Sequence, residues 1–314
     1  MLIYWVIFLA TVLLAVTRLR VSVVGWCAIA IPLILFIGLR YEVGWDWASY
    51  LAYLVRASDK SLFEVLQFKD PGYQIVNWIS AAFGFDVWFV NTVAAAVFVV
   101  GLVQFIRTLP DPRVALAVSI PYIVIVMAMG YTRQAMAFGL VLWALKLLIE
   151  QRLVGFVALL ALSATFHKSA VILVPLAVLA NTRNRTWTFV WVGATGLLLF
   201  VLLLQEHVEA LYQNYVVSDY AEASEGGPVR VLMNAVPALF FLMLRKRFDI
   251  SQQERALWFW VSALALVCIP LVAVSATAVD RVALYLMPIQ LVVASHLPTF
   301  VRSGGRVLVR ATVL

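Results

Sequence analysis

Long apolar runs alternate with short polar clusters along most of the chain. A helix needs about 20 residues to cross the hydrocarbon core of a bilayer; some runs reach that length and several fall short. The pattern predicts an all-α bundle of transmembrane helices. The runs cover residues 2–17, 21–39, 73–83, 86–106, 114–130, 132–149, 153–166, 168–180, 187–204, 230–244, 255–276 and 282–299.

The amino-acid composition also indicates a membrane protein, and it indicates that the membrane domain covers the whole chain. Hydrophobic residues make up 64% and charged residues 12% of the 314 residues, with a mean hydropathy of +0.99. These values lie outside the range of soluble globular proteins, so we expect one integral membrane domain over residues 1–314. The net charge of +7 does not indicate nucleic-acid binding, because most Lys and Arg lie in short loops, where they orient membrane proteins.

Basic loops set the expected orientation, since Lys and Arg stay on the cytoplasmic side. The alternation is consistent only if the run at 73–83 is a re-entrant or interfacial helix. The chain then makes about eleven crossings with its N-terminus outside. If 73–83 crosses instead, Arg107 is placed outside. The basic positions are Arg18, Arg20, Arg107, Arg113, Lys146, Arg152, Arg183, Arg185, 245–247 and 302–310.

Five polar clusters fall at the outer face in this topology, at residues 40–46, 131–134, 167–169, 226–230 and 280–281. Four of them place a cation in the first turn of an inward-running helix, where the helix dipole favours an anion; these cations are Arg133, Lys168, Arg230 and Arg281. Together they predict a shared polyanionic partner, and a pyrophosphate fits. Arg40 is either a helix anchor or a fifth cation of the site.

Two outer loops, residues 40–72 and 205–229, are rich in aromatic and acidic residues and are expected to form the site. Aromatic faces beside carboxylates suit sugar rings, although an interfacial aromatic belt would have the same composition. In the first loop, the spacing of Tyr50, Leu51 and Leu54 predicts an amphipathic helix on the membrane surface. The second loop carries Tyr212, Tyr215 and Tyr220.

His167 is the candidate for acid–base chemistry, because neighbouring cations lower the pKa of a histidine and leave a free ring nitrogen. It could equally be a packed histidine bonded to backbone. Asp46, Glu42, Asp70 and Asp280 are rival bases. The loops carry no metal-ligand or nucleotide-binding motif, so the sequence favours a reaction without metal or cofactor.

Polar residues inside the spans are few. Gln104, Asn234 and Gln290 are expected to form hydrogen bonds between helices. A transporter or flippase usually places its polar site near the midplane, so clusters at the rim favour an enzyme. A non-catalytic membrane subunit is a third alternative, and it would tolerate substitution of Arg133 and His167.

A series of motifs resembles the EpsG family of Wzy-like exopolysaccharide polymerases. The segment Gly38-Leu39-Arg40-Tyr41-Glu42-Val43-Gly44-Trp45-Asp46, followed by Tyr50, is similar to the family pattern LRYxVGxDxxxY, with Trp45 replacing a small polar residue. Further matches follow in the family's order over about residues 1–295. They are Asp70-Pro71-Gly72-Tyr73, Arg133-Gln134, Phe166-His167-Lys168-Ser169-Ala170, the tyrosine-bearing loop before Arg230, and Arg281.

The resemblance implies a GT-C-like glycosyltransferase of the bacterial inner membrane. It would transfer glycan from undecaprenyl pyrophosphate to another lipid-linked repeat unit at the periplasmic or extracellular face. Because the sequence shows no obvious nucleophile pair, we expect an inverting single displacement. Chain-length regulators and export proteins would be its partners. An O-antigen ligase-like transferase or acyltransferase would differ only in acceptor.

Residue roles follow from this mechanism. Arg133, Arg230 and Arg281 would hold the pyrophosphate, with Arg40 and Lys168 in support. His167 or Asp46 would activate the acceptor. The residues expected to bind sugar or acceptor are Tyr50, Asp70, Tyr73, Gln134, Tyr220 and Asp280.

Overall fold

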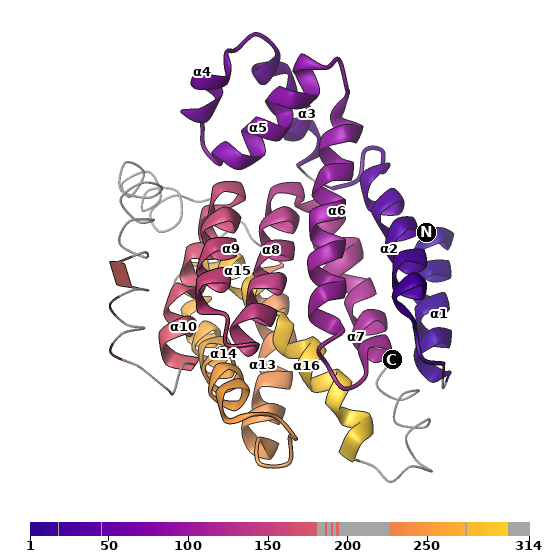
Figure 1. Cartoon of the computed structure of the whole chain (residues 1–314), viewed down its shortest axis with the longest axis vertical. Coiled ribbons are helices and arrows are strands. Elements are labelled where there is room, and N and C mark those ends of the chain that lie inside the picture. The colour runs from indigo at the N-terminus through magenta and orange to yellow at the C-terminus, as the bar shows by residue number, and fades with distance from the viewer. Residues whose placement is uncertain are drawn as a thin grey trace.

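The computed structural model describes residues 1–17, 19–44, 46–180, 226–273 and 275–300, together with isolated positions at 186, 190, 193 and 194. Helices account for the regular structure of these residues, and no strand occurs among them. The predicted all-α class is therefore confirmed for the described part of the chain. Most helices stand side by side in one bundle (Figure 1).

The bundle contains helices from both ends of the chain. Its N-terminal part comprises α1 (Leu2–Val16), α2 (Val23–Gly38), α6 (Val87–Ile106), α7 (Pro112–Ser119) with the π-helix η1 (Ile120–Ala128), and α8 (Thr132–Ile149). The rest comprises α9 (Leu153–Phe166), the 3-10 helix η2 (Lys168–Leu173), α10 (Val174–Ala180), α13 (Gly227–Leu244), α14 (Gln252–Leu271), α15 (Ala276–Leu286), α16 (Pro288–His296) and the 3-10 turn η6 (Leu297–Phe300).

Four of the described helices, α6, α8, α13 and α14, are long and apolar enough to cross a membrane. Helix α15 joined to α16 and η6 makes a fifth candidate, bent by 41°. Four shorter apolar helices are also present, at Leu2–Val16, Val23–Gly38, Pro112–Ala128 and Leu153–Phe166. The chain is thus a membrane protein, with four to five helices that meet the length criterion among the described residues.

Glycine lets α6 and α8 pack closely at the centre of the bundle. A Cβ atom on Gly101 would overlap the carbonyl oxygen of Gly139, and a Cβ atom on Gly139 would lie 2.5 Å from the Cα of Phe98. Small residues permit such close backbone approach in membrane bundles. This crossing fixes α8, which carries Arg133 in its first turn, against α6, the helix that follows the cap in the chain.

Three helices form a cap beyond one end of the bundle (Figure 1). They are α3 (Trp47–Ser58), α4 (Leu62–Leu66) and α5 (Pro71–Ala82). Outer loop 40–72 is thus largely helical, and α3 covers the predicted amphipathic segment. Helix α4 begins at a capping box, in which Ser61 and Glu64 satisfy each other's backbone N–H groups. Helix α5, with 12 residues, lies in the cap rather than alongside the bundle helices.

The run predicted at 282–299 is not one continuous helix. Helix α15 begins earlier, at Ala276, because the Ser275 side chain accepts a hydrogen bond from the backbone N–H of Ala278. Pro288 then lacks the N–H needed to continue the ladder and becomes the first residue of α16.

Polar side chains of α13 and α16 form hydrogen bonds around the break between α15 and α16. Asn234 donates to the carbonyl of Ala283 at 2.7 Å, and Gln290 donates to the side-chain oxygen of Asn234 at 2.7 Å. Elsewhere, Lys146 donates to Gln104 at 2.7 Å. The prediction that Gln104, Asn234 and Gln290 form hydrogen bonds between helices is confirmed.

Candidate functional site

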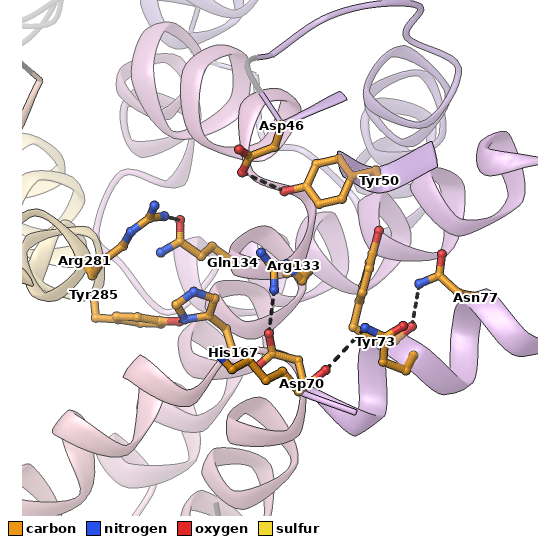
Figure 2. A network of polar contacts seen from close by, with 12 residues as sticks. Asp46, Tyr50, Asp70, Tyr73, Asn77, Arg133, Gln134, His167, Arg281 and Tyr285 are labelled. Carbon is orange, nitrogen blue, oxygen red and sulfur yellow. Dashed lines mark hydrogen bonds and ion pairs between the residues drawn. The ribbon is translucent and has the colours of Figure 1, made fainter. Parts of the chain in front are cut away.

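The site lies where the cap meets the ends of the bundle helices, and it centres on the first turn of α8 (Figure 2). Arg133 and Gln134 are adjacent in this turn, so their side chains leave the helix about 100° apart. Arg133 donates to Asp70 of the cap at 2.8 Å. Gln134 accepts from Arg281 of α15 at 2.8 Å. One helix turn therefore joins the cap to the C-terminal half of the chain.

Asp70 reaches Arg133 because of its backbone conformation. It is the N-cap residue of α5, with φ 57° and ψ 62° in the left-handed region, and Pro71 follows it. Burial raises the pKa of the Asp70 carboxyl, and the Arg133 guanidinium opposes that rise. Asp70 was expected to bind sugar; in the structure its carboxylate is the counter-ion of Arg133, whose guanidinium also lies 5.0 Å from the ring centroid of Tyr53.

A second arginine group surrounds Tyr131. The guanidinium groups of Arg230 and Arg281 lie 5.7 Å and 5.6 Å from the Tyr131 ring centroid. Arg230 also forms an ion pair with Asp280 at 2.6 Å. Gln134 and Asp280, both expected to contact sugar or acceptor, thus bond to arginines of the same site.

The predicted first-turn position holds for three of the four cations. Arg133 is the second residue of α8, Lys168 the first of η2, and Arg230 the fourth of α13. The prediction is wrong for Arg281, which lies in the second turn of α15 because the Ser275 cap starts that helix at Ala276.

Arg40 is a buried anchor. Its side chain donates to the carbonyl of Ile37 at 2.8 Å, to the side chain of Asn91 at 3.1 Å, and to the hydroxyl of Thr132. These contacts tie the end of α2 to α6 and to the start of α8. Of the two roles left open by the sequence, the geometry favours the anchor.

Asp46 is positioned by a close approach of two backbone segments. Gly44 has φ 96°, and a Cβ atom there would lie 2.8 Å from the Cα of Gly130. Only glycine combines this backbone conformation with so little space. Asp46 is the N-cap residue of α3; its carboxylate makes no capping hydrogen bond and instead accepts one from the Tyr50 hydroxyl at 3.3 Å.

Tyr50, Tyr53 and Tyr73 form the aromatic core of the cap. The ring of Tyr73 lies 5.9 Å from that of Tyr50 and 6.0 Å from that of Tyr53. Tyr50 is 2% and Tyr73 0% exposed, so their ring faces are covered by protein. The Tyr73 hydroxyl is itself buried, so both rings pack the cap together.

His167 lies between α9 and η2, with extended backbone at φ −157°. Its Nδ1 is 3.5 Å from the hydroxyl of Tyr285. Burial, followed by the charges of Arg281 and Arg133, lowers the pKa of His167 well below its ordinary value. The imidazole is therefore neutral at physiological pH, as predicted from its cationic neighbours.

The site contains more buried hydrogen-bond donors than acceptors. Six buried side-chain nitrogen atoms of the site have no hydrogen-bond partner among the described residues: Arg40 Nε, Asn91 Nδ2, Arg133 Nε, Gln134 Nε2, Arg230 Nη1 and Arg281 Nε. Buried donors are normally satisfied, because leaving them unpaired costs about 1–3 kcal/mol each. A ligand rich in oxygen acceptors, and above all an anion, would complete these bonds.

Some predicted features lie outside the described residues, including Tyr220, Trp45 and most of loop 205–229. Among the residues that are described, no three His, Cys, Asp or Glu side chains are grouped to hold a metal ion. Sequence reasoning placed Tyr131 and Thr132 in the cluster 131–134 without giving them a role, and it missed Asn91 and Tyr285. Tyr285 had one available signal, because it follows Arg281 by four residues and so shares its helix face.

Fold and site together define an α-helical membrane protein with a cation-rich polar site at one end of its bundle. The chain belongs to the EpsG family, whose model matches residues 23–313. No curated protein and no solved structure matches it. Family membership suggests a Wzy-like polysaccharide polymerase, which is a glycosyltransferase.

Proposed function

We propose that the protein polymerises polysaccharide at the periplasmic face of the bacterial inner membrane. A glycan carried on undecaprenyl pyrophosphate is transferred to a sugar hydroxyl of a second undecaprenyl-linked repeat unit. The observation that carries this proposal is the excess of buried guanidinium and amide donors in a chain of the EpsG family. A pyrophosphate leaving group supplies the oxygen acceptors that these donors lack.

Arg133, Arg230 and Arg281 bind the donor pyrophosphate in this mechanism. As the bond to the sugar breaks, negative charge grows on the bridging phosphate oxygen, and preorganised donors stabilise that charge. Lys168 adds a cation at the start of η2, and Arg40 fixes α8 from behind. Asp70 and Asp280 hold two of the arginines in place before substrate arrives.

The acceptor hydroxyl is not acidic, so a base takes its proton during attack. Asp46 and His167 are the two candidates: His167 lies near Arg133 and Arg281, and Asp46 lies beside Tyr50 in the same region (Figure 2). The acceptor oxygen attacks the anomeric carbon, a new C–O bond forms, and the electron pair of the old bond leaves with the phosphate oxygen. A single displacement of this kind inverts the anomeric configuration, and it requires no metal. Hydroxyls and carboxylates of the cap, together with loop 205–229, bind the sugars.

The proposed topology completes the membrane domain. The five long candidates and the four shorter apolar helices would give nine crossings. The runs predicted at 168–180 and 187–204 bring the total to about eleven in a GT-C-like arrangement. The cap and loop 205–229 then face the periplasm, and the lipid tails enter the site laterally from the bilayer. A chain-length regulator and export proteins would receive the polymer.

Elongation of a synthetic undecaprenyl-pyrophosphate oligosaccharide by purified protein in nanodiscs tests this function. Product length is measured by mass spectrometry with and without EDTA. Arg281→Ala should lower elongation at least a hundredfold, because it removes a charged group from the leaving-group site. The matched control is Arg56→Ala in the cap, an exposed arginine that lies over the Phe68 ring, and it should leave the rate unchanged.

Two results would overturn the proposal. One is a wild-type protein that moves lipid-linked sugar across vesicles without elongating it, which would indicate a flippase. The other is transfer to a lipid acceptor without polymer growth, which would indicate a ligase.

A further inference from the structure

His167 and Tyr285 meet in the centre of the site, from segments 118 residues apart (Figure 2). The Tyr285 hydroxyl lies 3.5 Å from Nδ1 of His167. Tyr285 is 2% exposed, and its ring lies 6.3 Å from that of Phe138. The phenol is thus held by packing, and its hydroxyl has a fixed direction toward the imidazole.

The backbone of His167 is fixed as well. Its N–H donates to the carbonyl of Ser163 at 3.0 Å, and the Ser163 hydroxyl donates to the carbonyl of Ala137 in α8 at 2.8 Å. On the other side, Arg281 and Tyr285 share one face of α15, so the helix that presents the cation also presents the phenol.

A neutral imidazole carries one proton, on either Nδ1 or Nε2. If Nδ1 carried it and donated to the tyrosine oxygen, the Tyr285 hydroxyl hydrogen would need another acceptor. The described residues give this hydroxyl no hydrogen-bond partner besides His167. A buried hydroxyl hydrogen without an acceptor is costly, so the favourable arrangement has Tyr285 donating to an unprotonated Nδ1.

We propose that Tyr285 donates its hydroxyl hydrogen to Nδ1 of His167, so that His167 presents an Nε2–H donor to the pyrophosphate and Asp46 takes the acceptor's proton. This inference rests on the proposed function and resolves its two candidate bases. Tyr285 is a positioning residue that selects the histidine tautomer. His167 is a catalytic hydrogen-bond donor beside Arg133 and Arg281, and it cannot accept a proton at Nε2.

The roles balance in one step. The acceptor's O–H proton goes to the Asp46 carboxylate as its oxygen bonds the anomeric carbon. The electron pair of the broken bond remains on the phosphate oxygen, toward which the Nε2–H of His167 and the two guanidinium groups point positive charge. His167 keeps its proton throughout, and the Asp46 proton returns to solvent after the product leaves.

Two substitutions of His167 separate donor from base in the elongation assay. In His167→Gln the amide nitrogen lies close to the position of Nε2 and still donates, although it cannot accept a proton. We expect His167→Gln to keep kcat within about tenfold of wild type, the cost of replacing one hydrogen bond, while His167→Asn and Asp46→Asn fall much further. A His167→Gln variant as inactive as His167→Ala would identify His167 as the base and overturn the proposal.

Tyr285→Phe tests the positioning role. It should lower kcat about tenfold with little change in KM, because one hydrogen bond is lost. In the His167→Gln background, which lacks Nδ1, the same substitution should have no further effect. An equal loss in both backgrounds would show that the Tyr285 hydroxyl acts independently of His167, which would overturn the positioning role.

The tautomer can be read without any activity. Long-range proton–nitrogen NMR of ¹⁵N-histidine-labelled protein distinguishes protonated from unprotonated ring nitrogens, and the chain has 3 histidines. Signals missing in His167→Gln assign His167. An unprotonated Nδ1 with a protonated Nε2 is expected in wild type, and the opposite pattern would refute the inference. This readout stands even if wild type fails to elongate glycan, so the two proposals fail separately.

Discussion

The ion pair between Asp70 and Arg133 joins the cap to α8, and its strength can be measured by a double-mutant cycle. The variants are Asp70→Asn, Arg133→Gln and the combination of both. Arg133 Nη1 and Asp70 Oδ2 are 2.8 Å apart, and the side chains are 8% exposed for Asp70 and 23% exposed for Arg133. A hydrogen bond between charged groups contributes about 1.5–3 kcal/mol. Because Arg133 is partly accessible to solvent, which screens the charges, we expect a coupling free energy of roughly 2 kcal/mol.

The coupling free energy measures the strength of the ion pair, whereas the stability change of either single variant does not. Burial of the Asp70 charge carries a desolvation cost that Asp70→Asn removes, so that variant alone can be nearly neutral in stability. Arg133→Gln leaves a buried carboxylate without its counter-ion and should be the more destabilising single change. The free energy of unfolding is measured at pH 8 by titrating micelles with denaturing detergent. A coupling below about 0.5 kcal/mol, the level of an exposed pair, would refute this account of the cap.

Three further predictions concern stability. Gly44→Ala should lower the free energy of unfolding by about 1–2 kcal/mol and lower activity, because the added Cβ strains a positive φ and presses against Gly130. Gly130→Ala is the matched control, since a Cβ there meets nothing within 4 Å. Equal melting temperatures for the two variants would contradict the argument. Gly139→Ala should cost about 1–3 kcal/mol by forcing α6 from α8, and an unchanged melting temperature would show that the crossing can shift freely. Burial raises the pKa of Asp70, so the folded state binds the carboxyl proton more tightly than the unfolded state. The free energy of unfolding should therefore fall as pH rises from about 4 through the raised pKa. Asp70→Asn should remove this dependence of stability on pH, and an unchanged dependence would assign it to other groups.

Local signals predicted the helices and the cations, since apolar runs and positions at helix ends depend on nearby residues. The runs at 86–106 and 132–149 match α6 and α8 almost residue for residue. The predicted helix boundaries were wrong where a helix cap or a proline was overlooked. The Ser275 cap starts α15 early, and Pro288 then divides one predicted span into two helices.

The pairings could not be predicted, because they join residues far apart in the chain. Arg281 and Gln134 are 147 residues apart, and Arg133 and Asp70 are 63 apart. Chemistry alone made Asp70 and Gln134 equally suitable as sugar ligands. Only the crossing of the helices shows that arginines already occupy their oxygen atoms.

These pairings explain why the site draws on so much of the chain. The neighbours Arg133 and Gln134 leave α8 in different directions, one toward the cap and the other toward α15. Displacing the cap would remove the counter-ion of Arg133, and displacing α15 would remove Arg281 together with Tyr285. The charges around His167 therefore depend on both contacts at once. Under the proposed function, a substrate anion that competes with Asp70 for Arg133 would also loosen the cap, and phosphate binding would then be coupled to acceptor access through the first turn of α8.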